Sequence, residues 1–270
     1  MSIYKKQTEV LRPDLGARTK ALFTERLGGV SSGPWGGPEG VMGLNVGSRV
    51  GDNAACVRMN RSIVAQLAPG APRWMTQVHG TRVVRADDIL DETTEADASW
   101  SMTPGVVCVV QVADCLPVLI ASRDGSIVAA VHAGWRSLAG GIVEETVRTL
   151  RAALDEAHGA GAGAQAQFRA WLGPRIGFDD FETGLEVLSA FEAHFGEAPE
   201  CVRRTQDKAY LDLAGYARRA FAAAGVSDVE DCALSTVSDP ARFYSYRRDG
   251  ARTGRHAALI WIEPETGAQN

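Results

Sequence analysis

The 270-residue chain lacks several features that would place it in a familiar class of protein. No window approaches the length of an apolar membrane span, and the N-terminus has no apolar stretch like that of a secretory signal. The five cysteines are odd in number and scattered, without a paired Cys-x-x-Cys spacing, so a disulfide framework is not expected. These absences predict a cytoplasmic protein without a membrane partner.

The chain has no segment in which charges of one sign are concentrated. The net charge is −5, and acidic and basic residues are interspersed, without the basic patch that marks a nucleic-acid-binding surface. We therefore expect no nucleic-acid partner. Hydrophobic residues make up 45% of the chain, which is enough to bury the core of one large domain or two small ones.

Strand-like and helical patterns occur together along the sequence. Apolar, β-branched runs lie near 19–24, 73–79, 82–86, 106–121, 127–133, 168–172, 232–237 and 257–262. Apolar residues recur every three or four positions in 53–68, 138–155, 182–195 and 211–224. This mixture predicts an α+β fold or a mixed sandwich. Two glycine-rich segments predict loops, a long one at Gly28–Gly40 that could be a lid or slack chain, and a flexible connector at His158–Gln167.

Three short segments place a sulfur or an imidazole where an apolar run meets a turn, and they contain His79, Cys115 and His132. Two imidazoles and a thiolate suit zinc, and three protein ligands leave the fourth tetrahedral position free for water or substrate. A lone histidine is more often a packing or surface residue, but three such groups together favour a catalytic metal site. The alternative ion is Cu²⁺.

Other polar residues lie in motifs that an ordinary core would not contain. Asn45 stands between glycines, Arg61 lies near the inner edge of a predicted helix, and Arg175 lies in a tight turn that opens a helix, where turn chemistry, a solvated side chain and helix entry are the simpler explanations. Arg247 lies in 243–250, which with Thr253-Gly-Arg255 alternates aromatic and basic residues in a manner suited to stacking a ring and holding phosphate, and a solvated hairpin rim is the alternative. Asp114 precedes Cys115, so regular strand alternation would turn it away from the site unless the turn breaks that alternation. It could then orient a metal-bound histidine.

The ordered motifs resemble the YfiH family, also called the laccase-domain or polyphenol oxidase family, whose members are described as purine nucleoside phosphorylases. The motifs include Leu44-Asn-Val-Gly47, Gln77-Val-His-Gly80, Ala113-Asp-Cys-Leu-Pro117, Val131-His-Ala-Gly-Trp-Arg136 and Thr253-Gly-Arg255. The resemblance implies a single-domain α-β-β-α sandwich over residues 1–270, with mixed sheets, related to cytotoxic necrotizing factor-like deamidases. It also implies that zinc is held by His79, Cys115 and His132.

The activity implied by this resemblance is zinc-dependent phosphorolysis of adenosine, inosine or methylthioadenosine to free base and ribose 1-phosphate, with adenosine deamination as a side activity. Phosphorolysis requires cationic groups for phosphate and polar groups for ribose. The expected catalytic residues are Cys115, His132, Asp114 and Arg61. The expected substrate contacts are Asn45, Gln77, Arg136, Arg175 and Arg247. We expect small-molecule partners only, and a monomer or weak dimer.

Two other kinds of enzyme remain open at this point. Without metal, Cys115 and His132 could act as a nucleophile and base, as in the toxin deamidases that the fold resembles, giving amide hydrolysis or deamidation. The resemblance also implies a related amidase role, the editing of peptidoglycan precursors such as UDP-MurNAc-L-Ser. A copper-dependent polyphenol oxidase is the other alternative, but multicopper sites consume many imidazoles and the chain has only five histidines. A protein that only binds a metal or a nucleoside is a third class.

Overall fold

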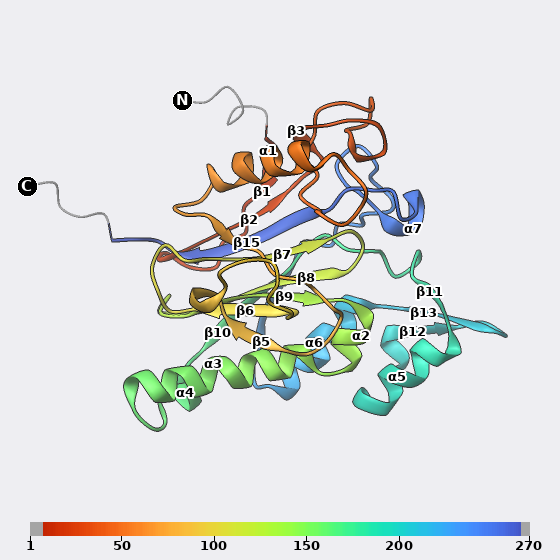
Figure 1. The fold of residues 1–270 in the computed structure, drawn as a ribbon. Helices are drawn as coiled ribbons and strands as arrows, with labels where there is room; N and C mark the ends of the chain where they lie inside the picture. The colour runs from red at the N-terminus through yellow and green to blue at the C-terminus, as the bar shows by residue number, and fades with distance from the viewer. Residues whose placement is uncertain (1–7, 266–270) are drawn as a thin grey trace, which may run out of the picture.

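The computed structural model describes residues 8–265, which form two stacked β-sheets with helices on both outer faces (Figure 1). The first sheet has five strands in the order β1-β2-β15-β7-β4. The strands are β1 (Val10–Leu11), β2 (Thr19–Thr24), β15 (His256–Ile262), β7 (Val107–Val112) and β4 (Pro72–Arg73). All neighbours in this sheet pair antiparallel except β4 and β7, which are parallel.

The second sheet has six strands in the order β14-β10-β8-β9-β6-β5. The strands are β14 (Asp228–Asp231), β10 (Phe168–Leu172), β8 (Leu116–Ser122), β9 (Val128–Ala133), β6 (Ala98–Ser101) and β5 (Val83–Arg85). Here β10–β14 and β5–β6 are parallel pairs and the others are antiparallel. The expectation of an α+β fold with mixed sheets is therefore confirmed.

Smaller elements surround these two sheets. An antiparallel three-stranded sheet contains β11 (Glu182–Gly184), β13 (Lys208–Leu211) and β12 (Val202–Arg204), and β3 (Leu27–Ser31) packs beside the first helix. The helices are α1 (Ala54–Ala65), α2 (Trp135–Ala139), α3 (Ile142–His158), α4 (Ala162–Gln165), α5 (Leu185–Phe195), α6 (Leu213–Ala223) and α7 (Tyr246–Asp249). Three short 3-10 turns are η2 (Gly33–Trp35), η3 (Ala86–Asp88) and η4 (Pro199–Cys201).

Three hydrophobic layers hold these elements together. Phe23, Val110 and Ala130 belong to the layer between the two sheets. A second layer lies between α1 and the five-stranded sheet, and a third lies between the six-stranded sheet and helices α2, α3, α5 and α6. Strands β8, β9 and β15 are covered on both faces, so every one of their residues is buried. This explains why these strands are continuously apolar in sequence.

Most of the predicted elements lie within a few residues of the observed ones, but two strand predictions were wrong in extent. The run 232–237 is not a strand, because Ala233 adopts a left-handed φ of 53° that breaks an extended chain. The parallel edge strand β14 precedes it. In 73–79 only Arg73 continues a strand, and the remainder forms the loop that carries His79.

Both glycine-rich segments contain more structure than expected. Gly28–Gly40 includes most of β3 and all of η2, and it is fixed by Asn60, whose Oδ1 accepts the Val30 N–H at 2.8 Å. The second segment, His158–Gln167, is not a simple flexible connector, because it contains α4. Arg151 donates to the carbonyl of Gly163 at 2.6 Å and thereby attaches α4 to α3.

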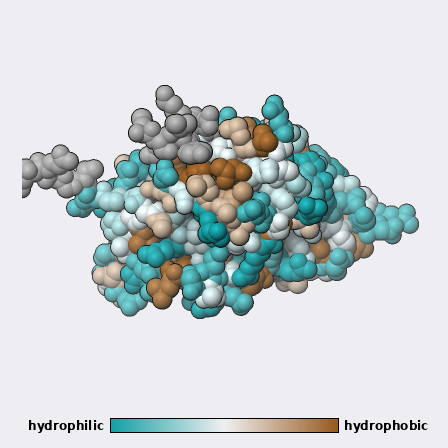
Figure 2. Space-filling model, turned by 45° about the horizontal axis from the view of Figure 1, so that its top comes forward, coloured by the Kyte–Doolittle hydropathy of each residue, from teal (hydrophilic) through white to brown (hydrophobic). Residues whose placement is uncertain are grey.

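Figure 2 shows one face that is mostly hydrophilic, with hydrophobic side chains in separate small patches. Among residues 8–265, none of the helices combines the length and the apolar character needed to cross a bilayer.

Candidate active site

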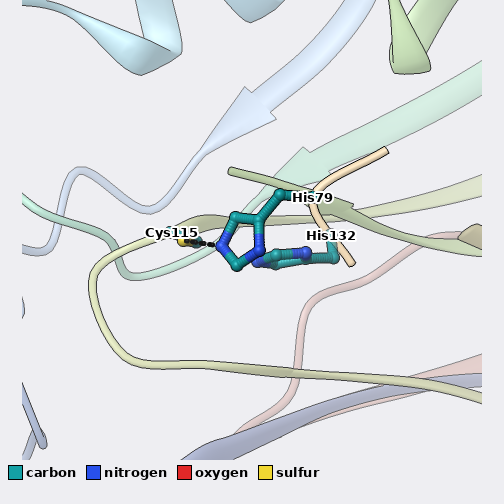
Figure 3. Close-up of side chains that lie close together, drawn as sticks. All are labelled: His79, Cys115 and His132. Carbon is teal, nitrogen blue, oxygen red and sulfur yellow. Dashed lines mark hydrogen bonds between the residues drawn. The ribbon is translucent and has the colours of Figure 1, made fainter. Parts of the chain in front are cut away.

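The three predicted ligands meet where the chain passes from one sheet to the other. Cys115 follows β7 and immediately precedes β8, His132 lies on β9, and His79 lies in the loop after β4. Figure 3 shows the three side chains facing one another, and their ligand atoms all lie within 4.8 Å of each other. The Sγ atom of Cys115 is 4.0 Å from Nε2 of His79.

Two imidazoles and a thiolate in this arrangement could hold a metal ion such as zinc. Tetrahedral zinc with ordinary bond lengths separates nitrogen and sulfur donors by roughly 3.4–3.6 Å, so the side chains would need to contract by about 1 Å. Gly134 makes their approach possible. A Cβ atom at position 134 would lie 2.9 Å from the His79 ring and 3.3 Å from both Cys115 Sγ and His132 Cε1. Only glycine leaves room for the three groups to converge.

Asp97 holds two of the three ligands in place. Its fully buried carboxylate accepts the backbone N–H groups of residues 78–80 at 3.2, 3.0 and 2.7 Å, and lies 2.8 Å from Nδ1 of His132. The Asp97 carbonyl also accepts the His132 N–H at 2.7 Å. His79 has a left-handed φ of 59°, which is unfavourable for a residue with a side chain, and the bonds to Asp97 stabilise this turn.

The electrostatics of the metal-free site favour a thiolate beside an imidazolium. Burial opposes ionisation of Cys115, but His132 and His79 outweigh burial and lower the pKa of the thiol to about 6. Burial likewise opposes protonation of His132, but Cys115 and Asp97 raise the pKa of its imidazole to about 9. The pKa of Asp97 is lowered: burial acts in the other direction, and the bonds from His132 and the backbone outweigh it. A thiolate is the form that binds metal or acts as a nucleophile.

Asp114 has a different function from the one predicted. The turn between β7 and β8, with Asp114 at φ 83°, breaks the strand alternation, so Asp114 and Cys115 line the same cavity. However, the Asp114 carboxylate accepts the hydroxyls of Thr236 and Ser245 at 2.5 and 3.0 Å and the Arg247 N–H at 2.6 Å. Because these three donors occupy its oxygens, it attaches the C-terminal segment to the site. The prediction that Asp114 orients a metal-bound histidine was wrong.

The ligand residues open into a cavity of about 600 Å³. Aromatic side chains contribute to its lining, among them Trp135, Phe181 and Tyr246. Four arginines also line it, namely Arg49, Arg136, Arg247 and Arg255. None of these four guanidinium groups has a carboxylate of residues 8–265 within 4.0 Å. The cavity therefore presents four guanidinium groups without a paired carboxylate to a ligand, beside the carboxylates of Glu92 and Asp114 that also line it.

Two predicted arginines lie outside this lining. Arg61 donates from Nη2 to Glu92 at 2.7 Å and stacks 4.3 Å from the centre of the Trp74 ring. Arg175 donates with both terminal nitrogens to Asp231, at 2.7 and 2.9 Å. Each guanidinium is thus occupied by a carboxylate of the protein. This corrects the expectation that Arg61 is catalytic and that Arg175 contacts the substrate.

The two predicted amide side chains also bond to the protein itself. Asn45 is fully buried, donates to Asp52 at 2.8 Å and accepts the backbone N–H of Arg255 at 2.8 Å, so it has a structural position and not the expected substrate contact. Gln77 does line the cavity, but its amide pairs with the backbone N–H and carbonyl of Gln111, each at 2.8 Å. Arg136 and Arg247 line the cavity, and their contact with the substrate stays a prediction.

Sequence reasoning missed several residues of the site. Asp97 gave no signal, because it is a single acidic residue 35 positions away from His132. Arg49 and Tyr246 were also missed, although Tyr246 lies in an aromatic and basic segment suited to stacking a ring. Arg255 belongs to the same segment suited to holding phosphate, but it was not among the predicted substrate contacts.

Comparison with known proteins places this site in a family. The model of a family described as multi-copper polyphenol oxidoreductase laccase matches residues 20–263. The chain is 42% identical over 249 residues to the purine nucleoside phosphorylase PA4543 of Pseudomonas aeruginosa, covering 92% of this chain and 95% of that protein. It is 40% identical over 244 residues to the purine nucleoside phosphorylase YfiH of Escherichia coli, with 90% and 93% covered.

Solved structures agree with this placement. Neisseria meningitidis protein NMB0706 superposes with a TM-score of 0.83 at 40% identity, covering 94% of this chain and 99% of the other. YlmD from Geobacillus stearothermophilus superposes with a TM-score of 0.80 at 29% identity, covering 92% and 93%. Since the family model and the relatives each span most of the sequence, the chain belongs to the laccase-domain, or YfiH, family.

Proposed function

We propose that the protein is a zinc-dependent purine nucleoside phosphorylase that acts on adenosine, inosine or methylthioadenosine. One observation carries this proposal: a single cavity of about 600 Å³ combines three metal-binding side chains with four arginines that have no ion-pair partner. Such arginines suit a phosphate co-substrate, which they bind with charge-assisted hydrogen bonds. The names of the relatives from Pseudomonas aeruginosa and Escherichia coli support the same activity.

Phosphorolysis transfers the ribosyl group from a purine to phosphate. A phosphate oxygen forms a bond to C1′ of the ribose while the C1′–N9 bond breaks, and the bonding electron pair leaves with the purine, which takes up a proton. The arginines would hold the phosphate and reduce the repulsion that its charge creates. Trp135, Phe181 and Tyr246 offer apolar faces for the purine ring.

His79, Cys115 and His132 would hold the zinc ion, which when bound would supply Lewis acidity beside the substrate. The residues around these ligands keep the site in one geometry. Asp97 fixes the ring of His132 and the loop of His79, while Asp114 attaches the segment that carries Arg247. We propose adenosine deamination as a side activity of the same cavity.

The histidine inventory favours this proposal over a multicopper oxidase. Among residues 8–265, His79, Cys115 and His132 are the one set of three residues that could share an ion. His194 bonds to Glu144 at 3.0 Å, and His256 is buried with both ring nitrogens bonded to the backbone. Several copper ions would need more imidazoles than the cavity supplies.

A second candidate is a cysteine amidase acting on peptidoglycan precursors. In such an enzyme Cys115 would be the nucleophile, His132 the base, and Asp97, 2.8 Å from His132, the carboxylate that orients the base. A thiolate held by zinc is a poor nucleophile, so the two functions make opposite demands on Cys115. Metal analysis of protein purified without added ions therefore distinguishes them.

Incubation with inosine and phosphate, followed by chromatography, tests the phosphorylase. We expect hypoxanthine and ribose 1-phosphate in equal amounts. Cys115→Ala should lower the rate by at least about 10³-fold because the ion is lost. His158→Ala is the matched control, since His158 is exposed at the end of α3 and should change neither turnover nor metal content. Failure to form hypoxanthine above the level of Cys115→Ala would refute the proposal.

A further inference from the structure

We propose that Arg255 is the residue that anchors the phosphate, and that it binds free phosphate as a bidentate ligand through Nε and Nη2. This inference rests on the proposed phosphorylase function, because that function requires a phosphate beside the nucleoside. It also makes a separate claim about binding, which can be tested without turnover.

Arg255 differs from the other arginines of the cavity in how it is held. Arg49, Arg136 and Arg247 are exposed, whereas Arg255 is half-buried in the wall. Its Nη1 donates to the carbonyls of Thr253 and Gly254 at 3.2 and 2.9 Å. Nε and Nη2 have no acceptor among residues 8–265. One edge of the guanidinium is therefore fixed by the protein, and the other edge has the two parallel donors that match an oxyanion.

The Leu44–Gly47 motif positions this arginine. Asn45 Oδ1 accepts the Arg255 N–H at 2.8 Å, and the Arg255 carbonyl accepts the Val46 N–H at 3.2 Å. A Cβ atom on Gly47 would lie 2.8 Å from Cγ of Arg255, so only glycine lets the arginine stem lie across this backbone. Asn45 and Gly47 thus both position Arg255. Because the Asn45 amide bonds to the Arg255 backbone, it is not available to a ligand in the cavity.

The position of Arg255 suits a reaction at the metal ligands. Arg255, Cys115 and His132 all line the one cavity, so a phosphate on the free edge of Arg255 would share this cavity with the metal ligands. Arg49 lies on the segment that follows Gly47, donates to Thr76 Oγ1 at 2.8 Å and lines the same cavity. It provides a second cation for the phosphate, and both arginines lack the carboxylate partner that occupies Arg61.

Isothermal titration of inorganic phosphate tests this assignment on the metal-loaded protein. The titration includes a C-nucleoside analogue of inosine, which has no C–N glycosidic bond to break. Arg255→Gln should weaken phosphate binding by about 10- to 100-fold, the loss expected for one charge-assisted hydrogen bond to an anion, because glutamine can keep one donor. Arg255→Lys should bind with intermediate affinity, because it keeps the charge and loses the planar fork. Affinity for the analogue should stay unchanged.

Arg252→Gln is the matched control, since Arg252 is an exposed arginine that stacks over Trp35 and does not line the cavity. It should bind phosphate like the original protein. Equal phosphate affinity of Arg255→Gln and the original protein would overturn the proposal, and so would the absence of phosphate binding to the original protein. If Arg255→Gln does not fold, unchanged affinity of Arg255→Lys has the same meaning.

A parallel titration with inosine 5′-monophosphate separates free phosphate from phosphate carried by a nucleotide. Loss of nucleotide binding alone, with free phosphate unaffected, would contradict the assignment. The proposed phosphorylase activity is tested separately by the formation of hypoxanthine. If no hypoxanthine forms, the titrations still show whether Arg255 binds phosphate.

Discussion

The two sides of the cavity are built in different ways. On the ligand side, His132 lies opposite Pro117 in the β8–β9 pairing, and Cys115 directly precedes β8. On the arginine side, Arg49 lies in a loop and Arg255 directly precedes β15. Arg136 and Arg247 lie on the short helices α2 and α7, of five and four residues. Sheet register fixes the first side, whereas local backbone contacts hold much of the second.

This difference indicates what each side must do. Metal ligands have to converge on one point, and strand β9 together with the Asp97 carboxylate, which bonds to His132 and to the His79 loop, limits how far they can move. Phosphate changes its bonding during the reaction, and arginine side chains can follow it while keeping their charge. Substitution of a metal ligand should therefore abolish metal binding, whereas substitution of one arginine should weaken phosphate binding without abolishing it.

Among changes that leave the three ligands in place, the largest effect on metal binding should come from Asp97→Asn, which removes the acceptor shared by His132 and the His79 loop. We expect metal affinity to fall by about 10- to 100-fold, the usual cost of losing a partner that orients a ligand. Competition with a chromophoric chelator measures it. Asp114→Asn is the matched control, because its partners are Thr236, Ser245 and Arg247 and not the ligands. Equal loss in both variants would show that Asp97 acts only through overall stability.

A smaller effect concerns the pH dependence of Cys115 in metal-free protein. Because the pKa of its thiol is lowered to about 6, alkylation by iodoacetamide should be half-maximal near pH 6 and level above it. Burial raises the pKa of Cys232 to about 11, so its alkylation should continue to rise into the alkaline range. Peptide mass spectrometry follows both sites. A midpoint for Cys115 near pH 9 would mean that the imidazoles do not stabilise the thiolate.

The smallest catalytic effect should follow Arg175→Gln, which tests the distinction between paired and unpaired arginines. Its guanidinium bonds to Asp231, so phosphate KM should not change. Stability should fall by about 1–3 kcal/mol because a half-buried carboxylate loses one of its partners. Steady-state kinetics and thermal unfolding measure these two quantities. A raised phosphate KM without loss of stability would place Arg175 in the binding site after all.

The sequence predicted the ligand side better than the arginine side, and the physical reason is distance along the chain. Apolar periodicity and the turns beside His79 and His132 are local signals, so the mixed α+β fold and the group of three residues could be foreseen. Whether an arginine is free depends on remote partners. Arg61 is occupied by Glu92, 31 positions away, and Arg175 by Asp231, 56 positions away. No local pattern reveals such pairings.

Gly134 makes the site sensitive to any substitution at one position. Every other amino acid would add a Cβ atom among the three ligands, at 2.9–3.3 Å from their side chains. No substitution at position 134 is therefore conservative for metal binding. Any substitution of Gly134 should therefore act on the metal site first, through the contacts of the added Cβ with His79, Cys115 and His132.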